Sequence, residues 1–507
     1  MRDAIWAIVA RRASDRLYRR SRRFQLHLAR ARALVGAAGP IPVPRLIDQL
    51  RVVILARAPG CAAPHRRALE RLGDRDEFWR GATILEDVDA EVERRHGRAH
   101  DPHEAMGRVI APALAAFARH CVEQAIERRS DGTFFLAREG ATILRMYRRL
   151  ARALGVPVPR AAYLAVNRRL TFLAGLDEFS ARSLAPLWAQ YPNQSPRVLL
   201  RNCSLEEEVL PLLCKVGIEH PDAPSPGLDA LAGLFESTDV RARFVRARDT
   251  ARALLNDYLR ARGLVDARAA IMVDIGWRGS IQTNIERTLA ASGDAIHGVY
   301  MGLRGAAAGD SSRHGYLCDT RSADWMSECV LRNNSVFEMF ATARHGSVVG
   351  YARRAGGRVD ALVRAEPSEA ASFAGVLACA RRGVQRWFEA YADLAAGPGL
   401  VRDTGSIALR PAVLDRVRRF VLYPTGAEAR AFLDYTHVEN FGEYGVSGFA
   451  FGGSRRLVWF GGPPWGIPAR ALRALRSQRW PEGVCRRSGV PLANLWLDLC
   501  DTRRYTR

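Results

Sequence analysis

The stretch AIMVDIGWRGSIQTNIERTL, from Ala270 to Leu289, decides the fold. It opens with a short apolar run that ends at Asp274 and continues through a turn containing two glycines. Ile281, Ile285 and Leu289 then recur at helical spacing. An apolar run, a turn and an amphipathic segment are typical of a buried strand that leads into a helix. The stretch therefore predicts a strand–turn–helix unit.

The same alternation occurs elsewhere in the chain. The runs TFFLA (133–137), AAYLAV (161–166) and GVYMGL (298–303) are strand-like, and a helical pattern at 143–154 separates the first two. Strands that alternate with helices of this length favour a parallel sheet with helices on both faces. We therefore expect an α/β fold with a parallel-sheet three-layer core, a helical N-terminal arm and a mixed α+β C-terminal region.

Composition and spacing divide the 507 residues into four expected regions. These are a basic helical arm at 1–57, a polar linker or helical segment at 58–103, an α/β core with the ligand site at 104–351, and an accessory helical and Gly/Trp-rich region at 352–507. The last region contains a helical pattern at about 368–394. No apolar run approaches the roughly 18 residues that span a bilayer, and the N-terminus does not resemble a secretory signal. A cytoplasmic protein is expected, with its nine cysteines mostly buried and reduced and no zinc site.

The positive charge is concentrated at the N-terminus. The formal net charge is +23, and residues 1–57 hold 13 arginines against 3 acids. Such an arm could lie on an anionic membrane surface or on nucleic acid, or pack its apolar stripe on the rest of the protein. We favour packing on the protein, because arginine is abundant throughout this chain. Nucleic-acid binding is disfavoured, since no aromatic-interleaved basic surface, zinc finger or helix-turn-helix pattern is present.

Two loops carry the strongest indication of chemistry. LAREGAT (136–142) and VDIGWRGSIQ (273–282) each follow a strand and precede a helix, where parallel sheets collect ligands. Each offers an acid, Glu139 or Asp274, together with glycines and a helix N-terminus that suits a phosphate. The alternative is an ordinary turn, with Ser280 as helix cap and Asp274 as a buried acceptor. Spacing alone does not decide between the two.

Two other segments add candidates. YLAVNRRLTF ends a strand with a polar triplet, and paired arginines there suit an anionic substrate. Glu338 lies among apolar residues, where a carboxylate is either paired or ready for proton transfer. His345 is a candidate base. The candidate catalytic residues are Asp274, Glu139, Glu338 and His345, with Asp274 also a candidate metal ligand, and the candidate substrate- or phosphate-binding residues are Arg138, Gly140, Asn167, Arg168, Arg169, Gly276, Trp277, Arg278, Gly279, Ser280 and Gln282.

Five of these strings, FFLAREGATILRMY, YLAVNRRLTF, IMVDIGWRGSIQ, GVYMGL and FEMFATARHGSVVGY, occur in an order that resembles a group of bacterial proteins. That group comprises predicted hydrolases of the haloacid dehalogenase-like superfamily associated with surface-polysaccharide biosynthesis, and the resemblance covers roughly 105–351. It implies phosphatase chemistry with Mg²⁺. The phosphatases use an aspartate nucleophile in a DxD motif, but Gly276 stands two positions after Asp274. Asp87 and Asp89 in TILEDVDAEV fit a solvated helix better than a nucleophile motif.

The resemblance implies an accessory enzyme or binder of cell-surface polysaccharide biosynthesis. Its substrate would be a phosphorylated sugar, a nucleotide-sugar or a lipid-linked glycan. The first alternative is a non-catalytic scaffold that recruits glycosyltransferases to the inner membrane surface through residues 1–57. The second is a phosphoribosyltransferase-like phosphate-binding protein, although VDIGWRGS has one acid where that family carries two adjacent ones.

Overall fold

The computed structural model describes residues 75–190, 194–225, 227–289, 296–305, 310–322, 331, 334–364, 374–422, 424–433, 436–441, 443–448, 480 and 483–484. The expected basic arm at 1–57 and most of the Gly/Trp-rich tail lie outside these residues. So does Ser368, which opens the helix expected at 368–394.

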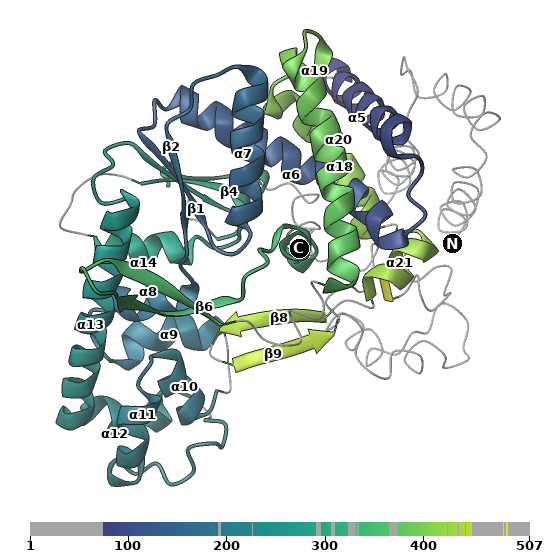
Figure 1. Ribbon diagram of the computed structural model, residues 1–507. Helices are drawn as coiled ribbons and strands as arrows, with labels where there is room; N and C mark the ends of the chain where they lie inside the picture. The colour runs from purple at the N-terminus through teal and green to yellow at the C-terminus, as the bar shows by residue number, and fades with distance from the viewer. Residues whose placement is uncertain are drawn as a thin grey trace, which may run out of the picture.

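The centre of the protein is a five-stranded parallel sheet (Figure 1). Its strands are β1 (Gly132–Leu136), β2 (Arg160–Leu164), β3 (Ala270–Asp274), β4 (His297–Leu303) and β5 (Arg313–Asp319), in the order β2-β1-β3-β4-β5. β1 and β3 are buried at every residue, as a parallel sheet covered on both faces requires. The four expected strands and the α/β fold class are confirmed, and β5 is an addition.

Helices cover both faces of the sheet. On one face α6 (Pro102–Glu127), α7 (Gly140–Leu154) and α18 (Val376–Ala396) share a core with Phe135 and Val273. On the other face α8 (Arg168–Gly175), α13 (Thr238–Arg262) and α14 (Ser280–Thr288) pack on Phe134 and Met272. Consecutive strand residues thus point into opposite cores, which is the geometry of a three-layer protein.

The other elements extend this core. Between β2 and β3 the chain forms α9 (Ala181–Gln190), α10 (Pro196–Asn202), α11 (Glu206–Val209), η1 (Leu210–Val216), η2 (Asp229–Leu231) and α12 (Ala232–Glu236). After β5 come η3 (Thr320–Ser322), α16 (Asn334–Ala341) and the antiparallel pair β6 (Ser347–Arg353) and β7 (Val359–Arg364). α19 (Leu400–Asp403), α20 (Ser406–Leu422), α21 (Gly426–Leu433) and the antiparallel pair β8 (Thr436–Phe441) and β9 (Glu443–Gly448) follow α18. The helix α5 (Arg75–His96) precedes α6 and packs on α18 and α20.

α6 and α18 are in backbone contact although about 270 residues separate them. A Cβ atom on Gly107 would lie 1.9 Å from the carbonyl oxygen of Ala380, and one on Gly383 would lie 2.1 Å from that of Glu104. Both glycines are therefore required by close packing. The region boundaries expected at 103/104 and 351/352 fall inside α6 and β6, so the helices after the sheet belong to the same core.

Two smaller observations bear on the sequence-based expectations. Within the described residues, no helix is both long and apolar enough to cross a membrane. Cys121, Cys203 and Cys318 are buried, Cys379 is half-buried, and Cys214 is exposed.

The strand order also locates the site. From β1 the chain moves first to β2 on one side and later to β3 on the other, so the direction of winding reverses between β1 and β3. Ligands in such sheets bind outside the carboxyl ends of the strands at this reversal. The loops β1–α7 and β3–α14, which the sequence singled out, are the two loops at that point.

Candidate functional site

Three carboxylates from three separate segments act on one another at this edge of the sheet. Glu139 lies in the β1–α7 loop, Asp274 ends β3, and Glu338 is carried by α16. The charge of Glu139 raises the pKa of Asp274, and the charge of Glu338 raises the pKa of both other carboxyls. We call Glu139, Asp274 and Glu338 the carboxylate cluster. The loops that follow β1 and β3 therefore lie next to each other, because these two strands are parallel neighbours in the sheet.

Hydrogen bonds hold the cluster in place. The indole N–H of Trp277 donates to Glu338 Oε1 at 2.7 Å. The Thr342 hydroxyl lies 3.1 Å from Glu139 Oε1 and 2.5 Å from the backbone oxygen of Glu338. The backbone N–H of Arg138 donates to Glu139 Oε2 at 3.0 Å. Glu139 and Glu338 are therefore tied to each other through one turn of α16.

The electrostatics favour a protonated acid at neutral pH. Burial, followed by the charge of Glu139, raises the pKa of Asp274 to about 8, against the lowering effect of the Gly276 backbone N–H and of Arg168. Burial is also the main reason why the pKa of Glu139 is raised, although Arg138 opposes the shift. Like charges in a site closed to water cannot all ionise. At pH 7 Asp274 therefore carries a proton.

His345 lies beside the cluster but is already engaged. Its Nε2 lies 2.7 Å from the hydroxyl of Tyr163, and its Nδ1 lies 2.8 Å from the carbonyl oxygen of Gly346. That carbonyl accepts, so Nδ1 carries the hydrogen and the Tyr163 hydroxyl donates to Nε2. The charge of Glu139, after burial, raises the pKa of Tyr163, which places this tyrosine next to the cluster. His345 thus orients Tyr163 in this arrangement, and the role of a free base predicted for it does not fit.

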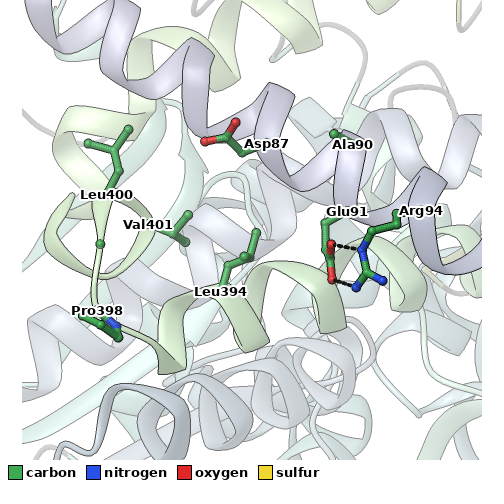
Figure 2. A pocket seen from close by; sticks show the side chains of 9 residues that line it. Asp87, Ala90, Glu91, Arg94, Leu394, Pro398, Leu400 and Val401 are labelled. Atoms are coloured by element: carbon green, nitrogen blue, oxygen red, sulfur yellow. Dashed lines mark hydrogen bonds and ion pairs between the residues drawn. The ribbon is translucent and has the colours of Figure 1, made fainter.

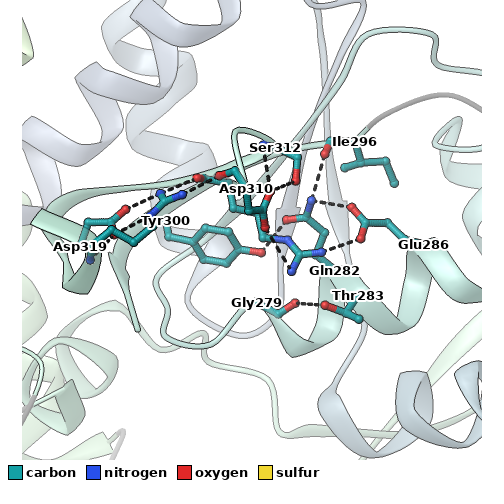
Figure 3. Close-up of polar contacts among 11 residues, drawn as sticks. Gly279, Gln282, Thr283, Glu286, Ile296, Tyr300, Asp310, Ser312 and Asp319 are labelled. Atoms are coloured by element: carbon teal, nitrogen blue, oxygen red, sulfur yellow. Dashed lines mark hydrogen bonds and ion pairs between the residues drawn. The ribbon is translucent and has the colours of Figure 1, made fainter. Parts of the chain in front are cut away.

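Gln282 does not face the site. Its side-chain Oε1 accepts from the Tyr300 hydroxyl at 2.6 Å, and its Nε2 donates to Glu286 and to the carbonyl oxygen of Ile296 (Figure 3). The residue is fully buried in this network, which Arg313 extends through Glu286. The prediction of Gln282 as a phosphate ligand was wrong, because its side chain is engaged by Tyr300 on β4, Glu286 on α14 and the backbone of Ile296 just before β4.

Asn167 and Arg169 have structural roles. The side-chain oxygen of Asn167 accepts from the Leu170 N–H at 2.9 Å and caps α8, while its amide nitrogen donates to the carbonyl oxygen of Val348. Arg169 donates to the carbonyl oxygen of Val349 at 3.3 Å. Arg168 acts on the cluster, because its charge lowers the pKa of Asp274.

The β3–α14 turn departs from the predicted phosphate cradle. The Gly276 N–H already donates to Asp274, and Trp277 is buried with its indole on Glu338. Gly279, at φ 67°, is the cap of α14, and Ser280 is the first helical residue. The alternative of an ordinary turn with Ser280 as the helix cap was therefore wrong in that detail. Arg278 is exposed to solvent.

Gly140 begins α7 and has a packing role. A Cβ atom there would lie 2.8 Å from the carbonyl carbon of Phe135, so the residue lets the helix start directly against β1. This contact positions Glu139 at the strand end.

The cluster does not fit the expected Mg²⁺ site. Among the residues that the structure describes, no group of three His, Cys, Asp or Glu side chains is arranged to hold a metal ion. Asp274, the predicted ligand, already accepts a hydrogen bond from the backbone N–H of Gly276. We therefore derive no step through a metal at Asp274.

A separate hollow of about 380 Å³ lies between α5 and the α18–α19 turn (Figure 2). Glu91 and Arg94 on its wall are paired with each other, and none of the cluster residues lines it. Asp87 also lines it, while Asp89 accepts from Trp387 and Arg416. Both aspartates lie within α5 and follow no strand, so they do not form a DxD nucleophile motif.

A scan against protein-family models and a search of the curated proteins found no match to this sequence.

Sequence reasoning missed two residues of the site. Thr342 bonds Glu139 and Tyr163 lies beside it, but neither was a candidate. Thr342 follows Glu338 by four residues on a helical pattern, so the two share one helix face. That spacing could have identified Thr342. Nothing in the sequence near Tyr163 indicates its distant partner His345.

Proposed function

We propose that the carboxylate cluster is an acid–base site acting on a phosphorylated sugar or nucleotide-sugar, as a hydrolase or transferase in the assembly of cell-surface polysaccharide. The single observation that carries the proposal is the buried position of Asp274 beside Glu139 at the winding reversal of a parallel sheet, where burial and the charge of Glu139 raise its pKa to about 8. Pairs of carboxyls whose environments separate their pKa values are the usual source of acid and base roles. The choice of substrate class rests on the family resemblance of residues 105–351.

The chemistry needs two roles. Asp274, protonated at pH 7, donates its proton to the oxygen of the bond that breaks. Glu139 accepts the proton of the attacking water or hydroxyl, so the site returns to its starting charge once the proton moves back to Asp274. Glu338, fixed by Trp277, supports the negative field that keeps Asp274 protonated.

The test uses the pH dependence of binding. Calorimetry with UDP-glucose at pH 7 and pH 9 compares the wild type with Asp274→Asn. We expect the wild type to bind several-fold more weakly at pH 9, because Asp274 then ionises and repels the diphosphate. The variant cannot ionise at this position, so it should bind about equally at both pH values.

The matched control is Asp266→Asn, which changes an exposed aspartate just before β3. It should keep the wild-type pH dependence. If Asp274→Asn also keeps it, Asp274 does not contact the ligand site and the proposal fails. Release of glucose or phosphate from UDP-glucose or glucose 1-phosphate, present in the wild type and lost in Asp274→Asn, would identify the reaction.

A further inference from the structure

Three histidines form a continuous chain of hydrogen bonds at the amino ends of β4 and β5. His297 is the first residue of β4, and His314 is the second residue of β5. His297 Nε2 lies 2.9 Å from His314 Nδ1, and His314 Nε2 lies 2.8 Å from Nε2 of His120 on α6. We call these three residues the histidine chain. The carboxylate cluster lies at the carboxyl ends of the strands, so the histidine chain is a separate feature at the opposite edge of the sheet.

The inner end of the histidine chain is bonded to the start of α20. His120 Nδ1 lies 3.0 Å from the hydroxyl of Ser406, the first residue of α20, and that hydroxyl donates to Glu123 on α6. The backbone N–H of Ser406 donates to Glu123 Oε1 at 3.0 Å. The Tyr316 hydroxyl donates to the carbonyl oxygen of Ser406 at 2.7 Å. The histidine chain and Glu123 therefore fix the first residue of α20 on α6.

Arg119 holds the turn that leads into α20. Its guanidinium donates to the carbonyl oxygens of Val401 at 2.6 Å and of Arg402 at 2.7 Å, and it is paired with Glu123 at 3.0 Å. Val401 also lines the hollow between α5 and the α18–α19 turn (Figure 2). The segment 401–406 is thus attached to one face of α6, and its attachment also fixes part of the wall of the hollow.

The bond to Glu123 decides which nitrogen of each ring carries a hydrogen. The Ser406 hydroxyl gives its hydrogen to the Glu123 carboxylate, so its oxygen accepts from His120 Nδ1. Neutral His120 then accepts at Nε2 from the Nε2–H of His314, which accepts at Nδ1 from the Nε2–H of His297. Every ring nitrogen except His297 Nδ1 therefore takes part in a bond within the chain or to Ser406.

The closed histidine chain has room for one added proton but not for two. A proton that binds His297 Nδ1 leaves every N–H···N bond intact, and His297 is half-buried. A second proton would have to bind a nitrogen that already accepts a hydrogen bond. Two N–H groups would then face each other, and that bond would break. Acid is therefore unfavourable for the closed chain.

Burial keeps the histidine chain neutral. It is the largest cause of the lowered pKa of all three histidines. Charged groups of both signs act on the chain from α6, α20 and the two ends of β5: Arg128, Arg410, Arg321, Glu127, Asp310 and Asp319. The effect of burial disappears when the chain opens to water, so the rings then take up protons below pH about 6.5.

We propose that the histidine chain is a pH-sensitive switch that holds the segment 401–406 on α6 at neutral pH and releases it in acid, while the parallel sheet stays folded. Each histidine of the opened chain binds one proton from water, and only hydrogen bonds are broken. The closed form is fully stable above pH about 6.5 and loses stability as the pH falls, because the pKa of each histidine is lower in the closed form than in the open one. The wall of the hollow formed by Val401 moves with the segment.

Hydrogen exchange of the full chain at pH 7 and pH 5, followed by mass spectrometry and corrected for the intrinsic exchange rate, tests the switch. The amide of Ser406 reports release of the segment, because it donates to Glu123. The amides of β3 report unfolding of the sheet. We expect Ser406 to be at least about tenfold less protected than β3, and its protection to fall on acidification by up to about 25-fold for each histidine that takes up a proton on opening.

Two variants and a control address the mechanism. His297→Gln keeps a donor at the Nε2 position and removes one titrating ring, so the fall in protection at Ser406 should be up to about 25-fold smaller. His220→Gln changes an exposed histidine and should behave as the wild type does. Ser406→Ala removes the hydroxyl that joins His120 to Glu123. It should lower the protection of the segment about tenfold already at pH 7, as for the loss of a hydrogen bond to a charged group.

Three results would overturn the proposal. Equal protection of Ser406 and β3 would mean that the segment is released only when the whole protein unfolds. A fall in His297→Gln as large as in the wild type would exclude the histidine chain as the group that senses pH. Wild-type protection of the segment in Ser406→Ala at pH 7 would show that the chain does not hold the start of α20.

Discussion

The indole N–H of Trp277 lies 2.7 Å from Glu338 Oε1 and joins the β3–α14 turn to α16. The two residues are 61 positions apart, yet both belong to the wall of the candidate site. Trp387 makes the same type of bond, with its indole N–H 2.7 Å from Asp89 Oδ1, on the far side of the helical layer. The pair allows a controlled test of what the first bond does.

Trp277→Phe keeps most of the ring and removes the donor. We expect the free energy of unfolding to fall by about 1.5–3 kcal/mol, because a hydrogen bond to a charged group is lost. UDP-glucose should also bind more weakly, since Glu338 is no longer fixed. Urea unfolding and calorimetry measure the two effects.

Trp387→Phe should lower the free energy of unfolding as well, but leave ligand binding unchanged. Equal losses of binding in both variants would mean that Trp277 acts only through general stability.

Asp274→Asn should stabilise the protein in alkaline solution. The pKa of Asp274 rises from an ordinary value of 3.8 to about 8 in the folded protein, so the folded state binds more protons than the unfolded state between these values. Wild-type stability is then fully present below pH 3.8 and is lost as the pH rises through 8. The loss is up to about 6 kcal/mol, and it does not occur in the variant, whose side chain at this position cannot ionise.

Urea unfolding at pH 5, 7 and 9 measures this difference. The gap between variant and wild type should widen with pH. A constant gap would show that Asp274 does not titrate in the folded state, and Asp266→Asn, at an exposed position, should show no gap.

Three buried histidines should lower the stability of the folded protein in acid, whereas Asp274 lowers it in alkaline solution. His120 Nε2 lies 2.8 Å from His314 Nε2, His314 Nδ1 lies 2.9 Å from His297 Nε2, and His120 Nδ1 lies 3.0 Å from the Ser406 hydroxyl. Burial, followed by nearby positive charges such as Arg128, lowers the pKa of His297 to about 3 and that of His314 to about 4. Burial and the charge of His314 lower that of His120 to about 3. All three are neutral in the folded protein.

The unfolded state takes up protons on these histidines below pH 6.5, so stability is lost as the pH falls from 6.5 towards 4. His314→Gln removes one of the protons that the unfolded state takes up. The dependence of the unfolding free energy on pH should therefore become shallower by about 1.4 kcal/mol per pH unit. Thermal unfolding between pH 7 and pH 4.5 measures it. The exposed His220 gives the control, and a His314→Gln slope as steep as that of His220→Gln would refute the assignment.

The sequence predicted what depends on local pattern. The strands β1, β2, β3 and β4 follow from uninterrupted apolar runs, and parallel winding places Glu139 and Asp274 on one edge. β5 was missed because RHGYLCD mixes charged and apolar residues, and three of its seven positions are fully buried. Its burial comes from helices distant in the chain, and no local pattern records that.

The side-chain roles were harder to predict, because their partners are distant. Gln282 follows the turn in sequence, but its side-chain oxygen accepts a hydrogen bond from the Tyr300 hydroxyl on β4. Trp277 was expected to bind phosphate, yet its indole N–H donates a hydrogen bond to Glu338. The residues that form a turn can be inferred from their neighbours in sequence, whereas hydrogen bonds between side chains on distant helices and strands cannot.

The glycine contact between α6 and α18 affects how the protein can be divided. Gly107 and Gly383 let the two helix backbones touch, and α18 covers part of the apolar side of α6. A fragment that stopped after the sheet would leave that side in water and would tend to aggregate. Any shortened form made for crystallisation or enzymology therefore has to extend through the end of α18.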